Sequence, residues 1–114
     1  MSGAGWHILR DGDTLTLARA LPPRFDVAAE TVLPFARPAR LAHQIRQDMW
    51  RALQSVRGFS PVVRVEARDG EMFVRAGGRA AAPVAASVRQ RIEDVLEDRA
   101  NRQRWLRHAG VQTC

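Results

Sequence analysis

Several residue types are absent or nearly absent from this chain, and each absence excludes a kind of site. There is no lysine and no tyrosine, and the one cysteine, Cys114, can form neither a disulfide nor a Cys-based metal site within one chain. No run approaches the roughly 20 apolar residues that a membrane span needs. Residues 1–5 have no basic leader segment. These absences predict a cytoplasmic protein that does not enter a membrane.

Residues that could carry catalysis are scattered. The histidines lack the spacing of metal ligands: His7, His43 and His108. No serine or threonine stands in a nucleophile elbow. The acid pairs Glu93/Glu97 and Asp94/Asp98 are typical of a solvated helix face, with Arg102 as a compensating charge. The sequence therefore predicts a protein that is not an enzyme and has no metal and no cofactor.

What the chain has in abundance is arginine. Its 18 basic residues, all arginine, outnumber 12 acidic residues and give a net charge of +6. The arginine and alanine content is typical of a GC-rich bacterial genome, so the choice of arginine over lysine says little by itself. The net charge, however, favours acidic partners, nucleic acid first. The excess is greatest in residues 37–57, where five arginines accompany one acid, Asp48.

The tetrapeptide Arg68-Asp69-Gly70-Glu71 predicts a β-hairpin, because a type I′ turn needs positive φ at both central residues. Pairing outward from this turn places apolar residues on one face: Val63, Val65, Ala67, Met72, Val74 and Ala76. The other face holds Arg64, Glu66, Arg68, Glu71, Phe73 and Arg75. A slip by one residue would mix the two faces, so the register and the turn support each other. We expect the apolar face to be buried under helices.

A similar tetrapeptide, Arg10-Asp11-Gly12-Asp13, predicts a first hairpin around Asp11-Gly12. One face of this hairpin holds Trp6, Ile8, Leu15 and Leu17, and the other holds His7, Leu9, Thr14 and Thr16. Arg10 and Asp13 fall in phase with the apolar face, so a longer loop is an alternative. Pro22-Pro23 ends the second strand. Residues 24–36 are compatible with a short helix capped by Asp26 or with a strand, and their structure stays open.

Two long helices are predicted from apolar residues that recur every three or four positions. The first runs from about Ala39 to Arg57, between Pro38 and Gly58, with the stripe Leu41, Ile45, Met49, Leu53 and Val56. The second runs from Pro83 or Ser87 to about His108, and a capping box of Ser87 and Gln90 favours the later start. Its stripe is Val88, Ile92, Val95 and Leu96. Contact with the core should end near Ala100, so the last turns should lie free or dock elsewhere.

The element order is therefore ββ, an unassigned segment, α, ββ, α. It predicts an α+β fold with two layers, in which a four-stranded antiparallel sheet from two hairpins has two long helices on one face. The 114 residues suit a single domain over 1–110, followed by a flexible tail over 111–114. Double-stranded-RNA-binding and KH-type modules have comparable elements in a different order, so the sequence indicates no family.

The first predicted helix carries the main candidate site. Trp50 lies about 120° from the centre of the apolar stripe and is surrounded by His43, Arg46 and Arg57. Arg46 is four residues before Trp50, close enough for a cation–π contact. A tryptophan among arginines can stack a base while guanidinium groups hold phosphates. The alternative is that Trp50 packs against the sheet edge or against residues 24–35.

Two further stretches are candidates for contact with an anionic partner. Arg64 and Arg75 face each other in the second hairpin, a like-charge pair that an anion would relieve. Arg79 follows Gly77-Gly78, where backbone N–H groups could meet an anion, although a plain flexible connection is the alternative. The last stretch contains Arg102, Arg104, Trp105 and Arg107. It fits a nucleic-acid arm, an oligomer contact through Trp105 and Leu106, or a solvated helix end.

These observations predict a small, basic, non-enzymatic binding module. Binding to nucleic acid, through the backbone of RNA or DNA, is slightly favoured. The alternative is an interaction with an acidic protein surface, as an accessory subunit of a bacterial complex. A homodimer through the last helix is a further option.

Overall fold

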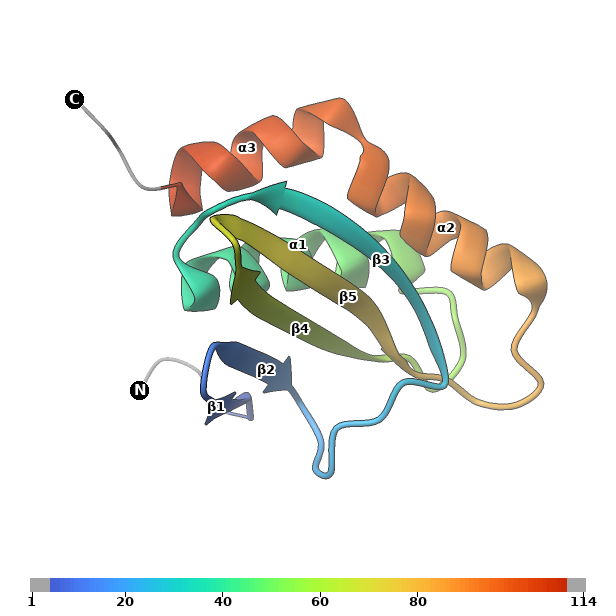
Figure 1. The fold of residues 1–114 in the computed structure, drawn as a ribbon. Coiled ribbons are helices and arrows are strands. Elements are labelled where there is room, and N and C mark those ends of the chain that lie inside the picture. The colour runs from blue at the N-terminus through green and yellow to red at the C-terminus, as the bar shows by residue number, and fades with distance from the viewer. Residues whose placement is uncertain (1–4, 111–114) are drawn as a thin grey trace.

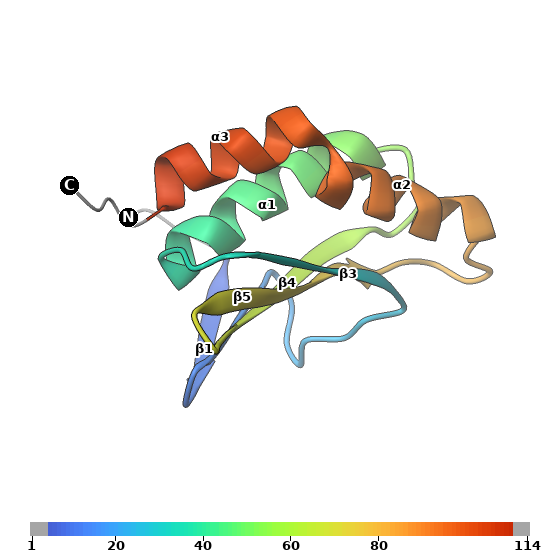
Figure 2. The ribbon, with the colours of Figure 1, turned by 45° about the horizontal axis from the view of Figure 1, so that its top comes forward.

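The computed structural model describes residues 5–110. Within that range the elements are β1 (His7–Asp11), β2 (Thr14–Ala18), β3 (Val27–Pro34), α1 (Pro38–Leu53), β4 (Ser60–Arg68), β5 (Glu71–Arg79), α2 (Ala86–Glu97) and α3 (Arg99–Ala109). The strands form one antiparallel sheet in the order β1-β2-β4-β5-β3. The helices lie together over one face of this sheet (Figures 1 and 2).

The predicted α+β class is confirmed, but two details are wrong. The sheet has five strands instead of four, and the helical layer has three helices instead of two among residues 5–110. The extra strand comes from the segment that the sequence left open, and the extra helix comes from a break in the second predicted helix. The predicted flexible tail over 111–114 lies outside the described residues.

The second hairpin has the predicted turn and register. Asp69 and Gly70 have φ values of 54° and 76°, as a type I′ turn requires. Arg68 lies opposite Glu71 and Val65 opposite Val74, as expected. The expected core residues are buried, with Val63, Val65 and Met72 fully covered and Val74 only 3% exposed. The hairpin therefore forms the centre of the sheet beneath the helices.

The first hairpin forms with a different turn from the one predicted. Asp11 lies opposite Thr14, so the loop residues are Gly12 and Asp13 instead of Asp11 and Gly12, and no longer loop is needed. Gly12 has a φ of 61°, and glycine at the first central position is typical of a type II′ turn. The change moves every cross-strand partner by two positions. Each side chain therefore keeps its predicted face, because faces alternate with a period of two.

The open segment contains β3, which pairs with β5 from Val27↔Gly78 to Pro34↔Glu71. Gly77 and Gly78 consequently lie inside the sheet. A Cβ on Gly77 would lie 2.0 Å from the carbonyl oxygen of Val27, and one on Gly78 would lie 2.0 Å from that of Ser60. Both predicted interpretations of Gly77-Gly78, a flexible connection and an anion-binding loop, are wrong, because neighbouring strands enclose this glycine pair.

Helix α1 buries the predicted stripe of Leu41, Ile45, Met49 and Leu53 against the sheet. It ends at Leu53 instead of Arg57, and turns lead to Gly58, whose φ is 68°. None of the helices within residues 5–110 combines the length and apolar character needed to cross a bilayer.

The second predicted helix is broken at Asp98. Its first half, α2, begins after Ala85 without a side-chain cap, so the capping box at Ser87 does not form. Asp98 has an extended backbone, and its carboxylate accepts a hydrogen bond of 2.9 Å from the backbone N–H of Asn101, which caps α3. The break resets the phase of the apolar stripe, so Trp105 and Ala109 are fully buried. The expectation that core contact ends near Ala100 is therefore wrong.

Candidate functional site

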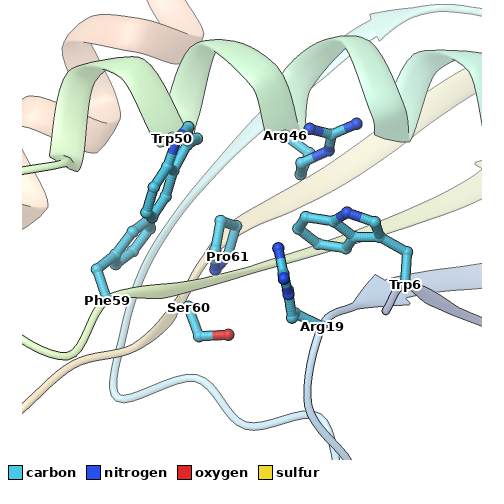
Figure 3. Close-up of a pocket in the computed structure, with 7 residues that line it drawn as sticks. All are labelled: Trp6, Arg19, Arg46, Trp50, Phe59, Ser60 and Pro61. Atoms are coloured by element: carbon cyan, nitrogen blue, oxygen red, sulfur yellow. The ribbon is translucent and has the colours of Figure 1, made fainter. Parts of the chain in front are cut away.

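A pocket of about 470 Å³ lies between α1, the β1–β2 hairpin and the start of β4. Its lining comes from three parts of the chain: Trp6 and Arg19, Arg46 and Trp50, and the run Phe59, Ser60 and Pro61. In Figure 3, Trp50 and Phe59 lie on one side, Trp6 and Arg19 lie on the other, and Pro61 is between them. The volume falls in the range of small-molecule sites.

The β1–β2 hairpin positions one side of the pocket. The observed register pairs His7 with Ala18, and its continuation by one residue places Trp6 opposite Arg19. The Cζ atom of Arg19 lies 5.6 Å from the centre of the Trp6 ring. Sequence reasoning missed both residues, because the Asp11-Gly12 turn would have paired Trp6 with Leu17. The signal that could have found them was the alternative turn, with glycine first.

Helix α1 supplies Arg46 and Trp50, one turn apart. Arg46 does not lie over Trp50, as the spacing suggested, but over Trp6, with its Cζ atom 4.6 Å from the ring centre. Trp50 is 45% exposed, so its ring remains accessible at the edge of the pocket. Arg46 therefore contacts the pocket wall formed by the β1–β2 hairpin and not the tryptophan of its own helix.

The arginines of the pocket have no acidic partners. Among residues 5–110, neither Arg19 nor Arg46 forms an ion pair. The Nε atom of Arg46 is shielded from solvent without a hydrogen-bond partner in this part of the chain. Burial lowers the pKa of Arg46, and the charge of Arg19 lowers that pKa further. The pocket thus has positive charge that no acid of the described chain compensates.

His43 lies beside this charge, one helical turn before Arg46. Its Nδ1 atom is 3.4 Å from Nη2 of Arg46 and can accept a hydrogen bond from it. Burial lowers the pKa of His43, and the charge of Arg46 lowers it further. The neutral imidazole is therefore the form that this environment favours.

Arg57, the remaining candidate from this region, is exposed in the turns after α1 and does not line the pocket. The expectation that Arg46, Trp50 and Arg57 share one helix face is wrong, because α1 ends at Leu53.

Arg64 and Arg75 face each other on the open side of the sheet, as predicted. Their like charges are already relieved by the segment that the sequence left open. Glu30 of β3 forms an ion pair of 2.6 Å with Arg75, and the ring of Phe25 lies 5.6 Å and 5.7 Å from the two guanidinium carbons. No external anion is needed to explain this pair.

Arg79 and Arg102 bind backbone carbonyl groups of their own chain. Arg79 donates a hydrogen bond of 2.7 Å to the carbonyl oxygen of Pro22, while its Nε is shielded without a partner among the described residues. Arg102 donates bonds of 3.0 Å and 2.7 Å to the carbonyl oxygens of Leu96 and Val32. Arg102 thus connects α3 to α2 and β3, and Arg79 connects β5 to the loop between β2 and β3.

The tryptophan of the last helix is part of the core. Trp105 is fully buried, and its Nε1–H donates a hydrogen bond of 2.6 Å to Asp48 of α1. Arg104 pairs with the same carboxylate. Trp105 is therefore not available for the arm or the oligomer contact expected of it, although Arg107 is exposed near the end of α3. A homodimer through other residues of the last helix stays a prediction.

Residues 5–110 contain no group of three or more His, Cys, Asp or Glu side chains that could hold a metal ion. The absence of metal, cofactor and catalysis stays a prediction. Comparisons with family models, with curated proteins and with solved structures found no match for this chain.

Proposed function

We propose that the protein is a non-enzymatic binding module for nucleic acid and that Arg19 and Arg46 hold phosphate groups at the pocket beside α1. The observation that carries this proposal is that both guanidinium groups lie over the ring of Trp6, with their Cζ atoms 5.6 Å and 4.6 Å from its centre, and have no acidic partner among the described residues.

The chemistry of the two arginines suits phosphate. A guanidinium group presents its N–H donors in one plane, and two of them match two oxygens of a phosphate. Contact with the ring of Trp6 helps to hold each group in place while leaving N–H donors for a ligand. Because Arg19 disfavours the charge on Arg46, an anion that contacts both side chains would relieve this repulsion.

The net charge of the chain supports the same partner. A charge of +6 raises the positive potential around the protein and favours encounter with polyanions. Arg37, Arg40 and Arg57 are exposed before and after the stretch of α1 that lines the pocket. A long polyanion extending from the pocket would therefore meet further positive charge.

The experiment is the salt dependence of binding to a short oligonucleotide. Removing one phosphate contact reduces the slope of log Kobs against log salt by about 0.7 for a single strand or about 0.9 for a duplex. We expect this reduction in Arg19→Ala and in Arg46→Ala, and about twice as much in the double variant. Thermal melting of each variant checks that the fold is kept.

Arg64→Ala is the matched control, because it removes the same charge from the opposite face of the sheet. An equal reduction in this control would mean that binding is spread over the surface, against the proposed site. Weak binding with a slope that no variant changes would favour the alternative, a protein partner with an acidic surface.

A further inference from the structure

We infer that the pocket accepts one unpaired nucleotide, with its base against Trp50 and its phosphate on Arg19 and Arg46. The protein would then prefer single strands to duplexes. This inference rests on the proposed function and specifies which form of nucleic acid the pocket binds.

The two sides of the pocket differ in chemistry. Trp50 and Phe59 line one side, where Trp50 is 45% exposed and Phe59 only 8% (Figure 3). Burying the remaining surface of Trp50 against another flat ring would be favourable, and every base offers such a ring. This side therefore suits a base of any identity.

The other side is cationic. Arg19 and Arg46 lie over the ring of Trp6. The two guanidinium groups therefore occupy this ring, and it is not open for stacking by a base. Pro61 lies between the two sides, and Ser60 adds a hydroxyl that can donate or accept a hydrogen bond. A nucleotide has the same division, with a flat apolar ring at one end and a charged group at the other.

Simpler ligands match only half of this lining. Inorganic phosphate or a carboxylate side chain would contact the arginines and leave Trp50 uncovered. A base inside a duplex has both faces stacked on its neighbours, so it must leave the helix before it can contact Trp50. A base in a single strand leaves its stack at lower cost.

The aromatic rings on the open face of the sheet are less available for stacking. The guanidinium carbon of Arg68 lies 3.9 Å from the centre of the Phe73 ring, and Phe25 lies beside Arg64 and Arg75. Trp50 has no such cation over its ring among the described residues. The structure therefore favours the pocket over the sheet face as the place where a base stacks.

The experiment compares three probes of equal length, about ten residues: oligothymidylate, an abasic deoxyribose-phosphate strand, and a mixed-sequence duplex. Binding of each probe is followed at low salt by the fluorescence anisotropy of a label at its end, because the abasic strand has no base that could quench tryptophan. Tryptophan fluorescence is recorded as well. Trp105 is fully buried and hydrogen-bonded to Asp48, so quenching by a base reports on Trp6 and Trp50. We expect oligothymidylate to bind roughly 5- to 150-fold more tightly than the abasic strand, and more tightly than the duplex.

Trp50→Ala should remove most of that difference without changing the salt slope, because stacking is not electrostatic. Trp50→Phe should keep part of it. Phe73→Ala is the matched control, an aromatic removal on the open face, and should leave the difference unchanged.

Equal binding of all three probes with a normal salt slope would overturn this inference and leave the proposed function standing. Tighter binding of oligothymidylate that survives Trp50→Ala would also overturn it, since the base would then stack elsewhere. Failure of every probe to bind would overturn the proposed function itself.

Discussion

Two regions beside helix α1 each combine a tryptophan with an arginine, and the two regions have opposite properties. On one side, Asp48 accepts a hydrogen bond from Trp105 and pairs with Arg104; we call this the Asp48 cluster. On the other side, Arg46 lies over Trp6 at the pocket. Asp48 and Arg46 are two residues apart, so at about 100° per residue they point to nearly opposite sides of the helix.

The difference between these regions is one carboxylate. The same residue types form a closed, satisfied contact where an aspartate meets them and an open, charged pocket where none does. Burying a paired group contributes to stability, whereas a cation without a partner remains available to a ligand. A tryptophan near an arginine in a sequence therefore does not by itself predict a buried contact or an open pocket. The position of the nearest acidic side chain decides between them.

The largest expected effect separates the two regions by stability. Trp105→Ala should lower the free energy of unfolding by about 3–5 kcal/mol, because it removes a fully buried ring from the core. Trp50→Ala should change it by only about 0.5 kcal/mol, as is usual at the surface. Urea unfolding of both variants measures the contrast. Similar losses in the two variants would show that Trp50 is a core residue as well.

A smaller effect tests the carboxylate alone. Asp48→Ala leaves the indole N–H of Trp105 and the guanidinium of Arg104 without their shared acceptor. We expect a loss of about 1–3 kcal/mol in the free energy of unfolding, the usual cost of an unsatisfied buried group. The matched control is Asp94→Ala, which removes an exposed carboxylate bound to Gln90 at 3.0 Å in α2. If both variants unfold at the same urea concentration, the Asp48 cluster is not a stabilising contact.

The smallest effect concerns pH and belongs to the pocket. The folded protein lowers the pKa of His43 below the ordinary value of 6.5, so the unfolded chain binds more protons between the two pKa values. The contribution of His43 to stability is therefore complete above about pH 6.5 and decreases as the pH falls toward the folded pKa. As the pH falls over this range, the melting temperature of His43→Gln should decrease less than that of the unsubstituted protein. An identical pH profile would show that Arg46 and burial do not act on His43.

The hairpin at the centre of the sheet was predictable because the local and global signals agree there. The Asp69-Gly70 turn and the alternation from Val63 to Ala76 require the same register. A strand was one of two alternatives for the segment that contains β3, and its neighbours in the sheet decide between them. Val27 and Ala28 lie against Gly77 and Gly78, whose missing side chains make room for the backbone, and no pattern within residues 24–36 reveals that.

The candidate site was predicted in part. Periodicity placed Arg46 and Trp50 together on the polar side of the first helix, and the structure lines one pocket with both. It could not supply Trp6 and Arg19, because they depend on the turn chosen at Gly12. It also ended the core contact of the last helix near Ala100, before Trp105, because a continuous stripe does not show that one extended residue, Asp98, changes the direction of the chain.

The pocket wall that contains Trp6 has low local stability, because Trp6 directly precedes strand β1. Strand β1 is at the edge of the sheet, pairs with β2 alone, and has all five residues exposed, so its hydrogen bonds can open without unfolding the core. The opposite wall is carried by α1 and by Pro61, and both are anchored in the buried core. A ligand that contacts both Trp50 and the arginines held against Trp6 would therefore fasten this edge of the sheet to the helix, and its binding free energy would appear as slower amide hydrogen exchange in His7–Asp11.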